Sequence, residues 1–524
     1  TYYLLAGLPV SADWMSRPIS PGLPAPNQYE KTDSRIRVRF GEGYEFNLRG
    51  DEKIEMLSEL FLNVSPYYCA LDKTTAEKHS SQIRFLHRQE IVNNTGPFFS
   101  DLKTNDLAVC LAPIKSGFLK HFPEAMTEPE NYVAMRGRTP DGGLEWEFTL
   151  FGQKLVVPTE PKFSKAIIDS KLAIWPPKVS AQWHLYVAHG TGAGGRWLLV
   201  DENGEPGDNV ELAADEYINI LNKAGKPNRP LAIVLRDSSG NERGTLFLAR
   251  LEEQQTAGLT ASLAMDFGTS NTSLAFTVPG NVPSPMLFTL SPKMLWGAEP
   301  RLENPGFVPF DWGGRKGYFP SILLKRQMAG FEGVKPETLE ARHLFAVDIP
   351  GLHANMESRV FDGTLHQTWP EIHKNLKWEH DPQHPWRRPA FLGLALLYAH
   401  AELFFRREAT VRNYVFTFPL AFSEREQRGF REETAKVISR IRQLCFGDLS
   451  PTDLQMVDES TAIANSVGAE GGGSLLETFI DIGGGTTDLA IRHRNLYLLK
   501  DSVKVAGKSF FSFSEQNFHP AAKD

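Results

Sequence analysis

The chain has 524 residues, of which 41% are hydrophobic and 23% are charged, and its formal net charge is −7. These values predict an ordinary soluble globular protein of roughly two to four domains, and they give no sign of a nucleic acid as the main partner. The three cysteines, Cys69, Cys110 and Cys445, lie far apart in the sequence. Neither a disulfide framework nor a zinc cluster is indicated, so we expect a reducing, cytoplasmic location.

The first 160 residues give mixed signals. RPISPGLPAP (17–26) carries four prolines and predicts extended coil, whereas IRVRFGEGYEFNL (36–48) alternates like a pair of strands. DEKIEMLSELFLNVS (51–65) has the apolar spacing of a short helix. The chain opens with Thr1, so we expect that its first residues were removed or that it belongs to something longer. Residues 1–160 are therefore treated as an unassigned mixed α/β region.

A small β-rich domain is expected over residues 161–258. Strand signals alternate with turn signals, and the predicted strands are 181–188, 195–201, 229–237 and 244–252. Gly190, Gly192 and Gly195 have the G-x-G-x-x-G spacing of dinucleotide loops, but a strand follows where a helix is needed, which favours a plain hairpin turn. Trp175, Trp183 and Trp197 could form a binding face, although core packing is the simpler interpretation. The polar stretch 252–262 is the predicted boundary.

Long helical signals appear after this boundary. PAFLGLALLYAHAELFFRR (389–407) starts at a proline and ends in arginines, and SEREQRGFREETAKVISRIRQL (423–444) opens on a capping box of Ser423 and Glu426. The apolar run 391–405 is shorter than the ~20 residues that cross a bilayer and contains a histidine and a glutamate, which predicts a buried helix and no membrane partner. Strands alternating with such helices predict an α/β fold.

One motif occurs twice. DFGTSNTSLAF begins at Asp266 and DIGGGTTDLAI begins at Asp481, and both read as strand, turn and strand. Glycines in the turns can expose backbone N–H groups as a concave anion site. An aspartate before each turn would repel a phosphate unless a hydrated Mg²⁺ lies between them. Two facing hairpins would then hold a polyphosphate and its metal; the alternative is two tight turns in which Asp serves only turn propensity.

These motifs resemble those of the actin-like ATPase superfamily, and most closely the nucleotide-binding domain of the seventy-kilodalton heat-shock chaperones. The segments 264–276 and 479–491 are similar to that family's two phosphate motifs. VFTFPLAFSEREQRGFREETAKV (415–437) and VDESTAIANSVG (457–468) are similar to its strand–turn–helix and connecting helix. The resemblance implies an α/β, two-lobed actin-like (ribonuclease H-like) ATPase module over residues 259–524, preceded by a mixed, β-rich N-terminal region.

The resemblance also implies roles for individual residues in binding ATP and Mg²⁺. Asp266 and Asp481 would hold the metal, Glu459 would order its water shell, and Asp488 would help to position the attacking water. The duplicate position of Asp488 is Ser273, so the two halves differ where one catalytic carboxylate is needed. The expected phosphate contacts are Gly268, Thr269, Ser270, Asn271, Gly483, Gly484, Gly485, Thr486 and Thr487.

The family also uses a lysine near the γ-phosphate. HKNLKW (373–378) lies in the expected interval, so Lys377 is the first choice and Lys374 the second. No motif fixes this assignment, and a solvated surface lysine is the alternative interpretation.

Departures from the family shape the functional hypothesis. The adenosine motif should lie well beyond the second hairpin, so the second lobe is expected to be incomplete at Asp524. The resulting hypothesis is a slow, switch-like, chaperone-like ATPase whose N-terminal region recognises a protein partner or client. The alternative is a non-catalytic interaction scaffold with an actin-like fold. A sugar or acid kinase is third, because no small-molecule pocket is legible. The pair His380 and His384 could suggest a metal site, but the adjacent prolines exclude a regular helix there.

Overall fold

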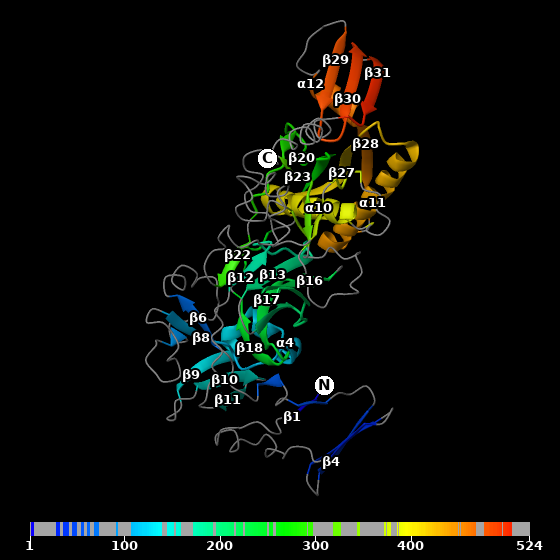
Figure 1. Ribbon diagram of the computed structural model, residues 1–524. Coiled ribbons are helices and arrows are strands. Elements are labelled where there is room, and N and C mark those ends of the chain that lie inside the picture. The colour runs from blue at the N-terminus through cyan, green and yellow to red at the C-terminus, as the bar shows by residue number, and fades with distance from the viewer. Residues whose placement is uncertain are drawn as a thin grey trace, which may run out of the picture.

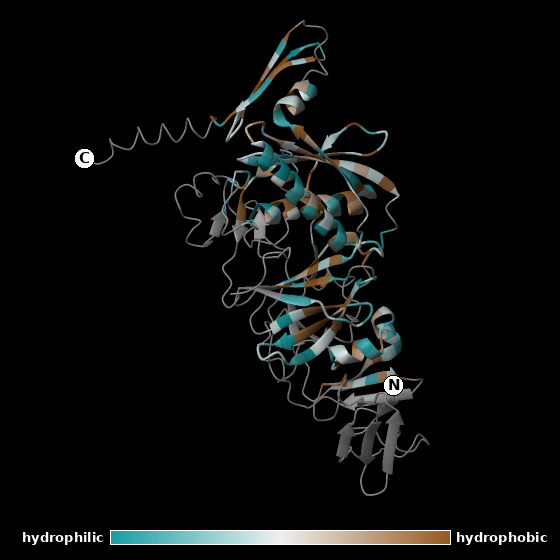
Figure 2. Ribbon diagram, turned by 90° about the vertical axis from the view of Figure 1, so that its right-hand side faces the viewer, coloured by the Kyte–Doolittle hydropathy of each residue, from teal (hydrophilic) through white to brown (hydrophobic). Residues whose placement is uncertain are grey.

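The computed structural model has a mixed α/β fold whose described parts follow one another along a long axis (Figures 1 and 2). The described residues are 2–4, 28–31, 35–40, 44–49, 54–56, 60–62, 68–72, 91–92, 106–138, 144–150, 153–158, 171–191, 195–213, 216–223, 226–248, 251–254, 258–290, 292–296, 318–325, 343–345, 371–373, 375–378, 385, 387–448, 450, 452–467, 476–494 and 496–505.

The N-terminal part contains three small sheets. Their strands are β1 (Tyr2–Leu4) with β5 (Ile54–Met56), then β2 (Gln28–Lys31), β3 (Arg35–Phe40) and β4 (Tyr44–Arg49), then β6 (Tyr68–Asp72), β8 (Asp106–Cys110) and β7 (Ile91–Val92). The predicted strand pair over 36–48 is confirmed by the β3–β4 ladder. The predicted helix over 51–65 is wrong at residues 54–56, because pairing with β1 makes this segment a strand. The proline-rich segment 17–26 lies outside the described residues.

A short helical segment and a three-stranded sheet follow. The elements are α4 (Ser116–His121), α5 (Glu124–Thr127), α6 (Pro129–Tyr132), β9 (Val133–Arg138), β10 (Leu144–Leu150) and β11 (Gln153–Pro158). Phe61, Phe118 and Phe148 are fully buried and pack edge to face, with Phe61 at 4.7 Å from Phe148 between ring centroids. This aromatic cluster holds the helices against the sheet.

Residues 171–248 form two antiparallel sheets. The first has the order β15 (Asp208–Ala213), β16 (Glu216–Asn222), β13 (Leu185–Thr191), β12 (Lys171–Trp175) and β22 (Lys293–Trp296); the second has the order β14 (Gly195–Asp201), β17 (Pro230–Asp237) and β18 (Glu242–Phe247). The four predicted strands are therefore present; the strand predicted over 195–201 has the bounds of β14, and the other three are shifted. The predicted hairpin between β13 and β14 is wrong, because these strands belong to different sheets.

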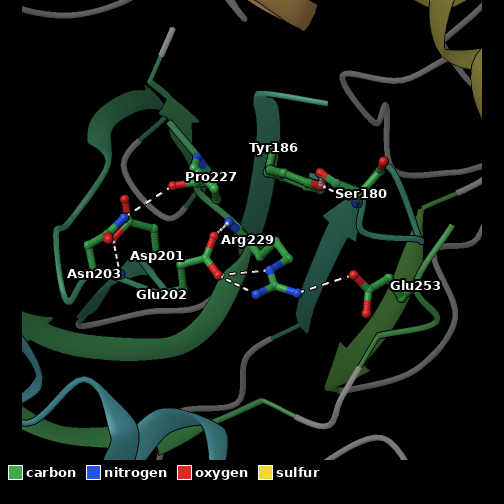
Figure 3. A network of polar contacts seen from close by, with 8 residues as sticks. All are labelled: Ser180, Tyr186, Asp201, Glu202, Asn203, Pro227, Arg229 and Glu253. Carbon is green, nitrogen blue, oxygen red and sulfur yellow. Dashed lines mark hydrogen bonds and ion pairs between the residues drawn. The ribbon is translucent and has the colours of Figure 1, made fainter. Parts of the chain in front are cut away.

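A polar network ties the end of this region to its sheets (Figure 3). Arg229 donates to Glu202 at 2.8 Å through Nε and to Glu253 at 3.3 Å through Nη1. The backbone N–H of Ser180 donates to the Tyr186 hydroxyl at 3.0 Å. Residues 252–254 also pair with Val179 through backbone hydrogen bonds. The start of the stretch expected as a boundary is thus held in place by the β-rich region.

The central unit is a six-stranded sheet with two long helices (Figure 1). Its order is β21 (Ser284–Pro285), β20 (Asn271–Thr277), β19 (Leu259–Phe267), β27 (Ala409–Phe418) and β28 (Asp453–Asp458), with β23 (Tyr318–Pro320) also on β20. β19 and β20 form an antiparallel hairpin, whereas β19, β27 and β28 run parallel. The carboxyl ends of the parallel strands therefore meet at the edge where the first glycine turn lies.

The two helices form as the sequence predicts. α10 (Arg387–Arg407) buries every residue from Phe391 to Phe405, and no helix in the described ranges is long and apolar enough to span a membrane. α11 (Glu424–Phe446) begins at Ser423, whose side chain and that of Glu426 make a reciprocal capping box, and ends at Gly447 with φ of 63°. Both helices cover the same sheet face, because Phe267 of β19 packs on Phe391 of α10 and on Phe430 of α11.

The central unit and the β-rich region share one hydrophobic core, although a boundary was expected near residue 258. Trp183 lies between Phe405 of α10 and Phe446 of α11, each at 5.2 Å between ring centroids. Trp175 donates to the Leu290 carbonyl at 3.1 Å, and β22 completes the sheet of β12. Trp175, Trp183 and Trp197 are all buried, so core packing, not a binding face, explains them.

A third unit carries the second glycine turn. β29 (Glu477–Ile482), β30 (Thr487–His493) and β31 (Leu496–Val503) form an antiparallel sheet above the central unit, and α12 (Glu459–Val467) leads to it from β28 (Figure 1). A separate sheet of β25 (His343–Phe345), β24 (Leu323–Lys325) and β26 (Glu371–His373) precedes the turn at 375–378. That turn delivers Lys377 to the site.

Candidate functional site

The first glycine turn is fixed by buried contacts. β19 alternates between core and surface, so Phe267 points into the core and Asp266 points out, where Thr417 of β27 donates to it at 2.7 Å. Ser321 is buried, donates to the Gly268 carbonyl at 2.7 Å and lies 2.8 Å from the Thr272 hydroxyl. A side chain at Gly268 would place its Cβ 2.4 Å from the Asn271 carbonyl oxygen. The turn therefore requires glycine.

The second turn repeats the first in register. Asp481 pairs with Asp488 across β29 and β30, as Asp266 pairs with Ser273 across β19 and β20. The duplicated motif thus folds as two equivalent hairpins, as predicted. In the second hairpin the Gly483 N–H donates to the Thr486 carbonyl at 2.9 Å and the Thr486 side chain is buried.

The two turns contact each other directly. A Cβ on Gly484 would lie 2.0 Å from Ser270 Oγ, and a Cβ on Gly485 would lie 2.3 Å from Thr269 Oγ1. Such distances do not occur between real atoms, so both positions accept glycine alone in this conformation. The turns that come from Asp266 and Asp481, 215 residues apart in sequence, therefore form one site.

A buried ion pair lies behind the turns. Glu459, the first residue of α12, pairs with Lys377, and both side chains are buried. Burial raises the pKa of Glu459 to about 7; the Lys377 ammonium opposes this, and the charges of Asp488 and Asp266 raise it further. The alternative interpretation of Lys377 as a solvated surface lysine is therefore wrong. Lys374 lies outside the described residues.

Several carboxylates gather around this one lysine. Burial raises the pKa of Asp481, the charges of Asp488 and Asp266 raise it further, and Lys377 acts in the opposite direction. Asp488 is 2% exposed, and its Oδ1 has no hydrogen-bond partner. Among the residues that the structure describes, four acidic groups thus act on one another and Lys377 is the cation that opposes them. Repulsion between like charges of this kind is relieved by protonation, as the raised pKa values of Glu459 and Asp481 show, or by a bound cation.

The donor set fits Mg²⁺ held through water. Among the residues that the structure describes, no group of three or more His, Cys, Asp or Glu converges closely enough to hold a metal directly. Mg²⁺ commonly keeps several waters and takes only one or two carboxylates, and Asp266 and Asp481 would supply these. The unpartnered Oδ1 of Asp488 is a third acceptor that a bound water could satisfy.

The other predicted site residues have different surroundings. Asn271 is exposed and opens β20, where it pairs with Pro320. Thr487 donates its hydroxyl to the Val505 carbonyl at 2.6 Å and lies on the opposite sheet face from Asp488. Its donor is therefore used within the sheet. His380, His384 and Gly192 lie outside the described residues.

Three further residues contact the first glycine turn or Asp266, although the sequence analysis gave them no role. Ser321 and Thr417 each donate a hydrogen bond to the first hairpin, at the Gly268 carbonyl and at Asp266. Trp378 donates from Nε1 to Thr269 Oγ1 at 2.8 Å. No spacing rule links these residues to the glycine motifs; the available signals were that Trp378 follows Lys377 directly and that Thr417 lies in the segment 415–437.

Comparisons with known proteins give only a distant likeness. No family model matches the chain, and no curated protein matches it. Among solved structures it is similar to MreB5 of Spiroplasma citri bound to ADP, with a TM-score of 0.29, and to the same protein bound to AMPPNP, with a TM-score of 0.27. In both cases the identity is 16%, and the match covers 50% of this chain and 57% of the neighbour. A likeness of this size carries no argument about function, so the function must be inferred from contacts within the chain.

Proposed function

We propose that the chain is an Mg²⁺-dependent ATP-binding protein that hydrolyses ATP slowly and uses the nucleotide as a switch. The observation that carries the proposal is the meeting of the two glycine turns, at Gly484 with Ser270 and at Gly485 with Thr269, in front of carboxylates that share one lysine. Exposed backbone N–H groups at such turns favour phosphate oxygens. The strand order around β19 supports an actin-like module with a lobe on each hairpin.

Each group of the site has a role in this proposal. Backbone N–H groups of both turns and the hydroxyls of Thr269 and Ser270 bind phosphate oxygens. Lys377 offsets negative charge near the γ-phosphate, and Glu459 holds its ammonium in place. Bound Mg²⁺ would neutralise charge between the phosphates and the carboxylates of Asp266 and Asp481. These groups act by positioning and charge neutralisation, which dominate phosphoryl transfer.

Asp488 is the residue proposed to orient water. Its free Oδ1 can accept a hydrogen bond from a water whose oxygen attacks the γ-phosphorus while the bond to the β–γ bridging oxygen breaks. The products are ADP and inorganic phosphate. The first hairpin has Ser273 at the equivalent position, so this role belongs to the second hairpin alone.

A switch follows from the contact between the turns. Thr269 and Ser270 lie against Gly485 and Gly484, so a polyphosphate must part the two turns as it enters. The second sheet would then move relative to the first, and hydrolysis would reverse this movement. ATP would thus set the relative position of the two lobes.

Residues 1–160 and 161–258 are proposed to recognise a protein partner or client, as in a chaperone-like cytoplasmic ATPase. The shared core supports this coupling, because Trp183 of the β-rich region packs directly on α10 and α11. A movement of these helices would therefore reach the β-rich region without a flexible connection.

One observation favours a second candidate, a non-catalytic scaffold that keeps the same fold. In this conformation the two turns touch, and a chain that never binds nucleotide could retain this contact as a structural joint. The buried Asp488 with an unpartnered oxygen opposes the scaffold, because a purely structural joint would gain by replacing it.

Equilibrium dialysis with labelled Mg·ATP separates the two candidates. We expect the protein to bind one nucleotide, Asp481→Asn to weaken binding at least 10-fold, and Asp501→Asn, an exposed control on β31, to leave it unchanged. Asp488→Asn should bind ATP but release at least 100-fold less phosphate. If the unmodified protein binds no Mg·ATP, the scaffold is the function; if it binds without phosphate release, the nucleotide is structural.

A further inference from the structure

Trp378 contacts both glycine turns. Its indole Nε1 donates to Thr269 Oγ1 of the first turn at 2.8 Å. The same nitrogen would lie 2.8 Å from a Cβ placed on Gly485 of the second turn. The neighbouring Lys377 pairs with Glu459 of α12, so consecutive residues of the turn at 375–378 serve different parts of the site.

The indole ring is held from two further sides. Lys504, just after β31, places its Nζ 4.7 Å from the ring centroid, and Phe422 packs edge to face at 4.9 Å. Lys504 directly follows β31 of the second hairpin's sheet, whereas Phe422 belongs to the segment between β27 and α11. Trp378 is half-buried, unlike the core residues Trp175 and Trp183. Core packing alone therefore does not explain its contacts.

The hydrogen bond to Thr269 has a chemical consequence. An indole nitrogen can only donate, so the Thr269 hydroxyl must accept from it. A hydroxyl has one proton and two lone pairs, and its proton then points elsewhere. The proton is thereby free to donate to an anion that enters between the turns.

We infer that Trp378 is a positioning residue that fixes the Thr269 hydroxyl as a donor to phosphate and, through Lys504, ties this donor to the sheet of the second hairpin. The inference rests on the proposed function and names a residue that no part of the glycine motifs contains. Trp378 does not itself need to touch the nucleotide.

A double-mutant cycle on Mg·ATP affinity tests this role. Trp378→Phe keeps a ring against Lys504 and Phe422 but removes the N–H, and we expect the Kd to rise about 3- to 10-fold. Thr269→Val removes the accepting hydroxyl. In the Thr269→Val background, Trp378→Phe should change the Kd less than 2-fold. An equal effect in both backgrounds would mean a general structural role and would overturn the inference.

Controls separate this test from folding and from the proposed function. Trp175→Phe also removes an indole hydrogen bond, to Leu290, and should lower the melting temperature without changing the Kd. If Trp378→Phe does not fold, Lys504→Met takes its place, with an expected rise in Kd of about 2- to 3-fold that disappears with Thr269→Val. No ATP binding by the unmodified protein rejects the proposed function. Binding that is indifferent to Trp378 and Lys504 rejects only this inference.

Discussion

The two hairpins share a motif but differ in support. β19 pairs with β20 on one side and β27 on the other, and its inward side chains are buried. β29 pairs with β30 alone within the described chain, and Ile480 and Ile482 are 62% and 64% exposed. In Figure 2 the uppermost sheet carries brown segments, which are hydrophobic residues.

The two hairpins also differ in how far the fold satisfies their polar groups. In the first hairpin, Asp266 accepts a hydrogen bond from Thr417 at one carboxylate oxygen, and Ser321 donates to the turn. The second has Asp481 with a raised pKa and Asp488 buried with a free oxygen. Polar groups left unsatisfied by the fold are available to a ligand, whereas satisfied ones stabilise the fold. We therefore propose that the first hairpin is the fixed side of the site and the second its reactive side.

The largest effect is expected from Lys377→Met, which removes the ammonium group that pairs with Glu459 and acts on Asp481. Glu459 would be left buried without its partner, which typically costs about 3–5 kcal/mol. Urea unfolding followed by circular dichroism measures this loss. ATP turnover should fall at least 100-fold as well.

The double variant Lys377→Met with Glu459→Gln is the matched control. It leaves no buried charge at this position, so most of the lost stability should return while ATP turnover stays low. If the double variant is as unstable as Lys377→Met, the ion pair does not explain the effect and the contrast between the hairpins loses its main support.

The pH dependence of stability should come from the reactive side. The pKa of Glu459 is raised from 4.5 to about 7, so the folded state binds more protons than the unfolded state between these values. The contribution of Glu459 to stability is therefore fully present below about pH 4.5. It is lost as pH rises to about 7, and the loss is about 3 kcal/mol at most. The raised pKa of Asp481 acts in the same direction.

Urea midpoints at pH 5, 6, 7 and 8 check this expectation. Glu459→Gln should show a flatter profile than the unmodified protein, because the neutral amide does not titrate. Burial acts to raise the pKa of Asp237, but Arg243 and Asn241 outweigh it and lower that pKa, so Asp237 should affect stability only at lower pH. Parallel profiles for the unmodified protein and Glu459→Gln would show that Glu459 does not titrate here.

A side chain added where the two glycine turns touch should weaken the contact between them. Gly484→Ala would place a Cβ 2.0 Å from Ser270 Oγ, and relief of such overlap costs about 1–3 kcal/mol. Thermal unfolding should show the loss, and the second change Ser270→Gly should restore part of it. Gly258→Ala is the control, because nothing lies within 4 Å of its Cβ position. Equal effects at both glycines would show that the turns do not touch in solution.

The smallest expected effect is the difference in stability between removing one hydroxyl at the first hairpin and one at the second. Ser321→Ala removes two hydrogen bonds at a buried position and should cost about 1–2 kcal/mol. Thr487→Val removes a single bond to Val505 at a more exposed position and should cost less than about 1 kcal/mol. Urea unfolding of the two variants measures the difference. A larger loss for Thr487→Val would reverse the assignment of fixed and reactive sides.

Local signals predicted much of this fold. The two glycine motifs became hairpins in equivalent register because strand alternation and turn residues act within a few positions. The capping box at Ser423 and the arginines after Phe405 marked their helices for the same reason.

Contacts between distant segments escaped prediction. β22 joins the sheet of β12 across more than 100 residues, and pairing with β1 turned part of the expected helix at 51–65 into a strand. Lys377 gave no sign of burial, since its environment comes from α12, 82 residues later. Trp378 likewise depends on contacts with the segments around 269, 422 and 504. A single sequence carries no pattern for such pairings.

The shared hydrophobic core limits how the chain can be divided into fragments that fold. A fragment that begins at residue 259 would uncover the faces of α10 and α11 that Trp183 contacts, and would lose the sheet that β22 completes. Large aromatic surfaces left exposed in this way promote aggregation. The unit that carries the two glycine turns is therefore best expressed together with residues 171–254, and a failure of the shorter fragment to fold would say nothing against the proposed activity.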